Sequence, residues 1–600
     1  MIQLAAKALA LLVWHFISIV ELALIGLAAW FALRPPARAE GVFRRLEQCL
    51  GRLARRRGWA AILVGLLALA ARAAFSPLLP IREPHITDEH SYLLAADTFA
   101  SGRLANPPHP MWRHFESMHI NQQPAYSSMY PPAQGLILAG GQLLAGHPWA
   151  GVFLSVGIMA GAICWALQGW LPPGWALLGG LLAAARLGIF SYWMNSYWGG
   201  AAAATGGALV LGAWPRLKRG RRVRHALVLA LGLAILANSR PYEGLLLSLP
   251  FGAAFLAWGL GRAGPGLRVW LAILAALALT AAAMGYYNWR LAGDPLQLPH
   301  RLNRATYAAA PLFFGESPKP PPSYRHAVMR DFYLGWELRW YLRTRSLAGW
   351  MRNALAKARD LWLFYLGPAL TLPLLLLPRA LADRRIRLAV LGCGFCLAGL
   401  FASVWFYPHY AAPLTAVFYL LIVQSLRHLR AGQRRSRPAG LWLARAVPLI
   451  CVLSLVVRAA VHPLLDAVPE MPLQWHHAKP GNLDRARVLA ELARTEGRHL
   501  AIVRYGPGHD PLLEWVYNAA NIEEAQVVWA RELDSPENER LIRAFPGRRV
   551  WLVEPDRKPP QLSPYRFRAS STQGGVASIS RPSSGAAWAT RSRILQAMSR

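Results

Sequence analysis

Two neighbouring carboxylates, Asp88 and Glu89, stand out in a chain that carries 65 lysines and arginines but only 30 acids. They open the stretch TDEHSYLLAADTFASGRL, directly after an apolar run that ends in AAFSPLLPIREP. A carboxylate at the boundary between hydrocarbon and water is partly desolvated, and this makes it a better base. Helix punctuation is the simpler interpretation, because Thr87 suits an N-cap, acids in a first turn favour the helix dipole, and Gly102 suits a helix end. The local sequence is compatible with both a catalytic base and a helix boundary.

A second set of candidates consists of arginines and polar residues near the predicted ends of apolar segments. Arginine binds phosphate through a bidentate fork, and a charged residue at a membrane edge is functional by default. The candidates are Arg240 and Glu243 in NSRPYEG, and Arg290, His300, Arg301 and Arg304 in YYNWRLAGDPLQLPHRLNRATY. Helix packing, or snorkelling of long side chains to the interface, would explain the same residues without any ligand.

Aromatic residues mark two further predicted helix ends. His409 and Tyr410 lie in YPHYAAP, where the histidine could orient a phosphate or a sugar hydroxyl or serve a structural role. Asn195 and Tyr197 lie in SYWMNSYWGG, which suits a sugar or isoprenoid headgroup lying against the backbone. The alternative for this second motif is an aromatic belt at the membrane edge.

Composition defines the class of protein that must position these residues. The chain has 600 residues, of which 54% are hydrophobic and only 16% charged, whereas a soluble chain carries about a quarter charged residues. A membrane span needs about 20 apolar residues. We predict 12 spans, at about 8–33, 59–79, 149–170, 174–190, 200–215, 224–239, 245–260, 268–286, 361–378, 388–406, 411–427 and 441–460. Residues 1–460 are therefore predicted to form an all-α polytopic membrane domain.

The distribution of charge predicts how the spans are oriented. The net charge of +35 does not indicate a nucleic-acid partner, because the basic residues fall in short loops such as RPPARAEGVFRRLEQCLGRLARRR and PRLKRGRRVRH. By the positive-inside rule these loops mark the cytoplasmic side. The apolar segment 133–146 is short enough to be interfacial, and leaving it out of the count keeps every basic loop inside. Residues 80–148 and 287–360, and everything after 460, are then predicted to be extracytoplasmic.

Cysteine usage argues against a disulfide-linked protein, and the N-terminal segment argues against a cleaved signal peptide. The five cysteines give no disulfide framework, and Cys393 and Cys396 are interpreted as small buried side chains of an apolar helix. The apolar run at 8–33 exceeds the core of a signal peptide, which is about 7–15 residues long, so we predict a spanning helix there.

The pattern changes after residue 460. RHLAIVRYG, AQVVWARE and RRVWLVEPD are typical of short buried strands, and they are separated by the helical patterns LDRARVLAELARTE and SPENERLIRAF. We predict a small extracytoplasmic α/β domain within 461–567. Residues 568–600 are rich in serine, glycine and arginine, so we predict that this tail is disordered.

The combination of an outer loop that opens with DE…Y…A…G, closes with YPP and precedes an interfacial segment resembles the membrane glycosyltransferases of the GT-C fold. The pattern is most similar to dolichyl-phosphate-mannose protein mannosyltransferases and lipid A aminoarabinose transferases, over about residues 59–430. The resemblance implies that the donor is a polyprenyl-phosphate sugar, that Asp88 is the base with Glu89 as its neighbour, and that Tyr92 and Tyr130 are motif residues. The first span and the C-terminal domain depart from both relatives, so the resemblance does not name the acceptor.

We therefore expect an inverting glycosyltransferase of a bacterial inner membrane, working on the extracytoplasmic face. Asp88 would take the acceptor proton and arginines would hold the lipid phosphate, so no cofactor is required, although divalent-metal use stays undecided. The acceptor would be a lipid, a glycan or a protein, and no nucleic acid is involved. The alternatives are a polymerase or ligase of lipid-linked glycans with a related fold, and a lipid or glycan transporter, which should show inverted repeats that the sequence does not reveal.

Overall fold

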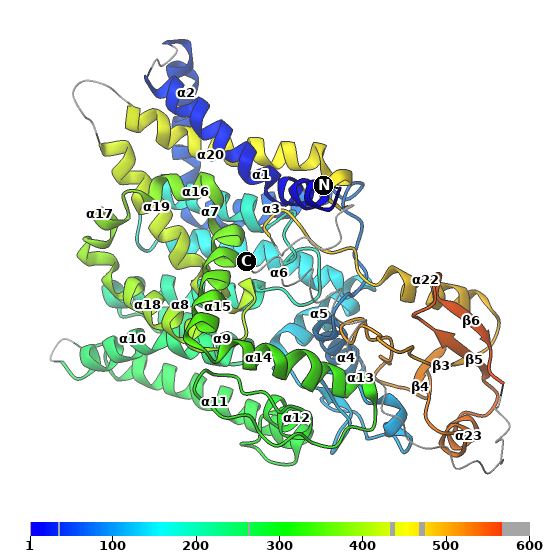
Figure 1. Cartoon of the computed structure of the whole chain (residues 1–600). Helices are drawn as coiled ribbons and strands as arrows, with labels where there is room; N and C mark the ends of the chain where they lie inside the picture. Colours follow the sequence, from blue (N-terminus) through cyan, green and yellow to red (C-terminus); the bar gives the residue numbers. More distant parts are fainter. Residues whose placement is uncertain (1, 34–36, 262–263, 433–438, 467–473, 567–600) are drawn as a thin grey trace. The chain divides into compact units, whose positions relative to one another are not determined.

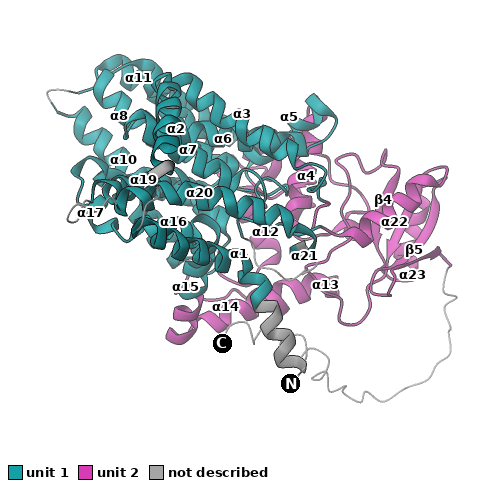
Figure 2. Cartoon of the chain, turned by 90° about the horizontal axis from the view of Figure 1, so that it is seen from above, with its two compact units in different colours: residues 1–82, 131–287, 354–480 teal, residues 83–130, 288–353, 481–600 magenta. Residues whose placement is uncertain are grey.

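A computed structural model describes residues 2–33, 37–261, 264–432, 439–466 and 474–566. The chain is mostly helical, with two small sheets (Figure 1). Contacts divide it into two compact units, coloured separately in Figure 2. Unit 1 contains residues 1–82, 131–287 and 354–480, and unit 2 contains 83–130, 288–353 and the chain from 481 onwards. The predicted disordered tail, 568–600, lies outside the described residues.

Unit 1 contains the apolar helices. They are α1 (Ile2–Leu33), α3 (Arg57–Ala74), α5 (Pro132–Ala145), α6 (Trp149–Leu167), α7 (Pro173–Leu187), α8 (Ala201–Gly220), α9 (Val223–Ala237), α10 (Pro241–Gly259), α16 (Gly367–Leu374), α17 (Leu377–Leu381), α18 (Arg387–Ala402), α19 (Thr415–Ala431), α20 (Ala439–Ala460) and α21 (His462–Asp466). Two helices run across the boundaries between the units, α11 (Leu267–Ala292) and α15 (Leu347–Leu361).

Among the described residues, seven helical stretches are long and apolar enough to cross a membrane. They are Leu12–Leu33, Arg57–Ala74, Trp149–Leu167, Leu267–Ala292, Arg384–Ala402, Pro408–Ala431 and Ala439–Ala460, with α7 and α9 as shorter apolar helices. Helical residues occur in each of the twelve predicted spans, and the segment predicted to be interfacial forms α5. The number of spans therefore stays a prediction, while the helical, multi-pass character of the chain follows from the seven stretches.

One local prediction was wrong. The basic segment after the first span is not a loop: residues Ala37–Arg55 form the amphipathic helix α2, whose Glu40 and Glu47 pair with Arg445 of α20 at 2.6 and 2.9 Å. The predicted span 361–378 is helical but has a break at Gly367, where φ is +60°, between the π-helical stretch η3 (Trp362–Leu366) and α16. A side chain at Gly367 would meet the Arg186 guanidinium, so glycine is required there.

The interior of unit 1 contains an ion pair among its apolar helices. Glu21 of α1 and Arg186 of α7 are 1% and 4% exposed, and Arg186 Nη1 lies 3.1 Å from Glu21 Oε1. The backbone amide of Ala369 donates to the second carboxylate oxygen at 3.0 Å, and Arg186 also donates to the carbonyls of Leu363 and Phe364. Each charge thus has a partner, as the cost of burying a charge in hydrocarbon requires.

Unit 2 combines loop segments with a four-stranded sheet. Its strand order is β4 (Val527–Arg531), β3 (His499–Val503), β5 (Arg549–Glu554) and β6 (Gln561–Pro564). β3 is parallel to both β4 and β5, and β6 is antiparallel to β5. The helix α22 (Leu483–Arg494) precedes β3, and α23 (Ser535–Ala544) lies between β4 and β5, so the predicted strands and helices of this segment are all present.

The sheet shares its core with the loop 83–130. That loop contains α4 (Thr87–Ala100), the turn η1 (Trp112–Phe115) and the small hairpin β1 (Ile120–Asn121) and β2 (Ser127–Ser128). One hydrophobic cluster combines Leu94, Phe115, Ile120 and Tyr126 of the loop with Leu500, Ile502, Val528 and Leu541 of the C-terminal segment. Polar contacts add to it: Tyr126 Oη donates to the Asn518 carbonyl at 2.9 Å, and the Ala520 amide donates to Asp97 at 2.6 Å. The sheet therefore supports the helix that carries Asp88.

The second loop segment of unit 2, residues 288–353, completes the unit. It contains α12 (Pro299–Tyr307), α13 (Ala327–Arg330), the π-helical stretch η2 (Asp331–Leu338) and α14 (Arg339–Thr344). Asn303 of α12 donates to the carbonyl of Ile120 at 3.2 Å and to the side chain of Asn121 at 3.0 Å. These bonds fix α12 against the hairpin of the first loop.

Candidate active site

Asp88 lies in the first turn of α4 with its carboxylate 23% exposed. Tyr130, 42 residues later, donates its hydroxyl to Asp88 Oδ1 at 2.5 Å. The hairpin β1–β2 positions Tyr130, whose backbone amide donates to Ser128 Oγ at 3.1 Å. Unit 2 thus brings together the two ends of the predicted motif and leaves part of the carboxylate open to solvent.

His119 is the third member of this group, and sequence reasoning missed it. Its Nδ1 lies 3.6 Å from Asp88 Oδ2 and 2.9 Å from Thr87 Oγ1. Burial lowers the pKa of His119, and the nearby Asp88 carboxylate offsets this only in part. The ring is therefore neutral near pH 7 and can accept or donate a hydrogen bond beside Asp88.

The backbone holds His119 in an uncommon conformation. Its φ is +64°, in the left-handed region that few residues other than glycine adopt. Ser91 Oγ of α4 donates to the His119 carbonyl at 2.7 Å and contacts Ser128 Oγ at 2.8 Å. The sequence points to His119 only by its position, in the stretch MHINQQPAYSSMY that ends at Tyr130.

Glu89 has the contacts of a helix-capping residue. It is 3% exposed, and its Oε2 accepts hydrogen bonds from the backbone amides of His85 at 2.7 Å and Ile86 at 3.3 Å. Ile86 is the N-cap of α4, so the interpretation of Thr87 as N-cap was wrong by one residue. The two neighbouring acids therefore differ: Glu89 closes the helix end, and Asp88 has the exposed carboxylate.

Aromatic rings flank α4. Tyr92 stacks on Tyr130 with ring centroids 4.5 Å apart, so two predicted motif residues are in direct contact. His90 stacks on Tyr517 of the C-terminal segment at 4.1 Å and 6°. Both stacking contacts restrict the rotation of α4, and hence the direction in which Asp88 points.

Four predicted phosphate-binding residues belong to the same unit as Asp88. Arg304 of α12 pairs with Glu337 at 2.7 Å and donates to the Ala310 carbonyl at 2.5 Å. Arg290 and Arg301 are exposed, and His300 is half-buried. The guanidinium fork of Arg304 thus has protein partners, whereas Arg301 presents its side chain to solvent.

The other predicted residues lie in unit 1, where some of them form a cluster. Tyr192 Oη contacts His409 Nδ1 at 2.8 Å, and the guanidinium of Arg240 lies 4.3 Å from the centre of the Tyr410 ring. Glu243, one turn further along α10, is 6% exposed. The two motifs NSRPYEG and YPHYAAP are therefore adjacent in the fold.

Asn195 and Tyr197 are packed inside unit 1. Asn195 donates to the carbonyls of Ile189 and Ser191, and its Oδ1 accepts from Arg72 Nε at 3.1 Å. Tyr197 is 4% exposed and donates its hydroxyl to the Arg82 carbonyl at 3.2 Å. These contacts hold the turn between α7 and α8, and a headgroup-binding role for either residue stays a prediction.

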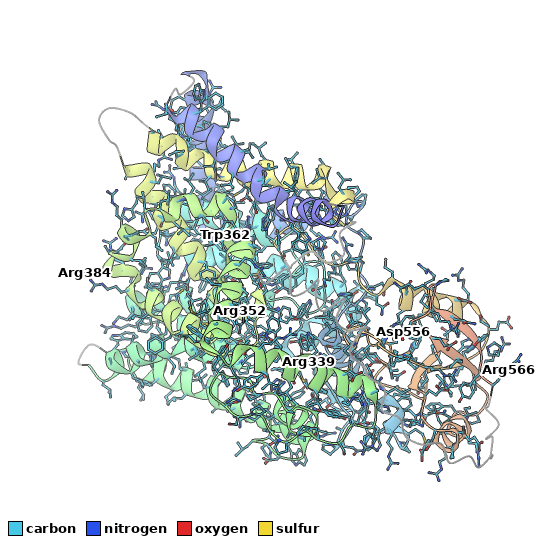
Figure 3. The ribbon with its side chains drawn as sticks, in the orientation of Figure 1. Arg339, Arg352, Trp362, Arg384, Asp556 and Arg566 are labelled. Carbon is cyan, nitrogen blue, oxygen red and sulfur yellow. The ribbon has the colours of Figure 1, made fainter. Side chains whose placement is uncertain are left out.

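The glycine-containing turn YGPGHDP, residues 505–511, is closed by an aspartate. Asp556, labelled in Figure 3, accepts from the Gly506 amide at 2.8 Å and contacts His509 Nδ1 at 2.8 Å. Tyr505 stacks on His509 at 3.9 Å. Within the described part of the chain, no group of three or more His, Cys, Asp or Glu side chains could hold a metal ion.

Replacing His90 with phenylalanine is expected to make unit 2 less sensitive to acid. Burial lowers the pKa of His90 well below 6.5, so as pH falls through 6.5 the unfolded state binds a proton that the folded state does not, and stability falls. Phenylalanine keeps a ring against Tyr517 and removes this proton uptake. Hydrogen exchange of β3 and β4 amides between pH 7 and 5.5 measures the effect, and equal pH dependence of the two proteins would contradict it.

Comparison with known proteins gives similarity at the level of structure alone. No family model matches the sequence, and no curated protein matches it. The Archaeoglobus fulgidus oligosaccharyltransferase, in its complex with zinc and sulfate, aligns with a TM-score of 0.44 and 12% identity, over 82% of this chain and 67% of that one. ArnT from Cupriavidus metallidurans bound to undecaprenyl phosphate aligns with a TM-score of 0.41 and 15% identity, over 82% and 92%. The structural neighbours are GT-C fold glycosyltransferases, the group named by the sequence resemblance.

Proposed function

We propose that this protein is an inverting glycosyltransferase that moves a sugar from a polyprenyl-phosphate donor to an acceptor on the extracytoplasmic face of a membrane, with Asp88 as the general base. The observation that supports this is the exposed edge of the Asp88 carboxylate, oriented by Tyr130 and lying beside a neutral His119. The motif resemblance that led to Asp88 adds to it.

One carboxylate is sufficient for this chemistry. Asp88 takes the proton from the acceptor group as that group attacks the anomeric carbon, and the bond from that carbon to the phosphate oxygen breaks on the opposite side of the sugar. Because a lipid phosphate is a good leaving group, no general acid is needed. A glycosidase, by contrast, uses two carboxylates on either side of the bond. Glu89 accepts hydrogen bonds from two backbone amides, which agrees with a mechanism in which Asp88 is the only base.

The neighbours of Asp88 have supporting roles in this proposal. Tyr130 holds Oδ1, which leaves Oδ2, with Thr87 and His119 beside it, to receive the proton. A neutral His119 brings no positive charge next to the carboxylate. Arginines would stabilise the charge that develops on the departing phosphate, and Arg301 and Arg290, which belong to the same unit as Asp88, are the residues to test first.

The experiment supplies the full-length protein, reconstituted in liposomes, with a labelled polyprenyl-phosphate sugar of known anomeric configuration. We expect transfer with inverted configuration, read by NMR of the product, and we expect transfer to continue in the presence of a chelator. Retained configuration would contradict the mechanism. Movement of the intact labelled lipid across sealed vesicles, without cleavage, would instead identify a transporter.

A further inference from the structure

A cavity of about 300 Å³ lies within unit 2 and is separate from the contacts of Asp88. Its walls come from residues 112–123, from α12 and from the loop 322–329. The segment 116–122 contributes to both places: Glu116 and Gln122 line the cavity, and His119 contacts Asp88. The cavity and the candidate base are therefore built on one stretch of chain.

Aromatic side chains and side-chain amides provide half of the lining residues. Trp112, Tyr307 and Tyr324 are the aromatic residues, and Asn121, Gln122 and Gln123 are the amides. Aromatic faces pack against apolar C–H surface, and amides recognise hydroxyl groups from the edge. Such a lining suits a ligand that is apolar on its faces and hydroxylated around its rim.

The charges at the cavity compensate one another. Glu116 is buried and accepts from Tyr307 Oη at 3.1 Å and from Arg325 Nη1 at 3.2 Å. Burial alone would raise the Glu116 pKa, but the contacts with His326, Arg325 and Tyr307 outweigh burial and lower it. With one anion facing one arginine, the site offers no excess positive charge for a phosphate or a nucleotide, so a neutral, polar ligand fits best.

Gln122 has a buried acceptor without a partner. The residue is 2% exposed, and its Nε2 donates to the Phe115 carbonyl at 2.7 Å. Its Oε1 makes no hydrogen bond to any described residue. This acceptor is enclosed by the protein, so the hydroxyl groups of a ligand would meet the exposed polar side chains of the lining, those of Gln123 and Ser323.

We propose that this cavity binds a sugar ring. Its volume is at the lower end of the range for small-molecule sites, about 300–1,000 Å³, which fits a ligand of monosaccharide size. A sugar also has the required chemistry, with C–H surfaces for the aromatic side chains and hydroxyl groups for Gln123 and Ser323. The proposal rests on the proposed function only for the source of the sugar, which is either the donor or a glycosylated acceptor.

The test fills the cavity and leaves its surroundings unchanged. Ser323 lines the cavity and is exposed, so Ser323→Trp places an indole in it, while Ser317→Trp puts the same group on an exposed position of the same loop outside it. Saturation-transfer NMR of the full-length protein in nanodiscs would use methyl mannoside, methyl galactoside and N-acetylglucosamine as probes. We expect at least one probe to bind wild type and Ser317→Trp alike, and Ser323→Trp at least about tenfold more weakly, which corresponds to about 1.4 kcal/mol. No binding to wild type, or equal binding to both variants, would overturn the proposal.

Transfer kinetics separate the two sources of sugar and keep the two proposals distinguishable. A raised KM for the labelled donor in Ser323→Trp assigns the cavity to the donor sugar, and an unchanged donor KM with slower transfer to a fixed amount of acceptor assigns it to the acceptor. If wild type transfers no sugar but still binds the probes, the proposed function fails and the sugar site stands. If transfer occurs but neither binding nor kinetics responds to Ser323→Trp, the sugar site fails and the function stands.

Discussion

Replacing Asp88 with asparagine is expected to slow sugar transfer by about 10²- to 10⁴-fold, the range that a general base contributes. Asparagine has nearly the same shape, and its carbonyl oxygen can still accept the hydrogen bond from Tyr130. The substitution therefore removes the basic oxygen while keeping the local contacts. The effect is measured as the initial rate of transfer from a labelled polyprenyl-phosphate sugar at a constant protein concentration.

The matched control is Glu83→Gln, since Glu83 is an exposed acid of the same loop. We expect Glu83→Gln to transfer at the wild-type rate. Tyr130→Phe should lower the rate less than Asp88→Asn, because it removes an orienting hydrogen bond and leaves the base. Wild-type activity in Asp88→Asn would show that the base is another residue.

The second large effect is on stability. Glu514→Gln is expected to destabilise unit 2 by about 3–5 kcal/mol, because it leaves the Arg531 guanidinium buried without its counter-charge. Arg531 Nη2 lies 2.5 Å from Glu514 Oε2, and both side chains are at most 3% exposed. Burial alone would raise the Glu514 pKa, but Arg531, Tyr505 and the Val516 amide outweigh it and lower the pKa. The pair is therefore ionised.

Hydrogen exchange of the β3 and β4 amides in the full-length protein measures this loss of stability. Glu539→Gln is the control, because Glu539 and Arg543 form an exposed pair on α23, 46% and 76% accessible. An exposed pair of this kind contributes about 0.3–0.5 kcal/mol. Equal protection in the two variants would show that Arg531 tolerates burial without Glu514.

Local pattern in the sequence was enough to place most helices and the C-terminal strands. Strand and helix signals after residue 480 identified β3, β4 and β5, because each strand contains four consecutive apolar residues, LAIV, VVWA and VWLV. At residues 361–378 the apolar run did not reveal the break in the helix, which occurs at Gly367 with its positive φ. A hydropathy pattern contains no information about backbone conformation.

For the candidate site, the family resemblance named Asp88 and Tyr130 as motif residues but predicted neither their contact nor the separate roles of adjacent residues. Asp88 and Glu89 look alike in the sequence, and only the fold shows backbone amides on one carboxylate and a tyrosine on the other. His119 lies 31 residues beyond Asp88, with no periodic relation to it. The contact of Asn195 with Arg72 joins residues 123 positions apart, so no pattern in the sequence indicates it. Such contacts follow from tertiary packing.

The core that joins the 83–130 loop to the C-terminal sheet has a consequence for biosynthesis. Leu94 and Phe115 leave the ribosome long before Leu500 and Val528, with the helices between them still to be made. At roughly 5–20 residues per second, this interval lasts on the order of 20–80 s. During that time the loop lacks much of its hydrophobic partner surface, so a nascent chain stalled before residue 499 would carry Asp88 on an incompletely folded segment, open to proteases and chaperones.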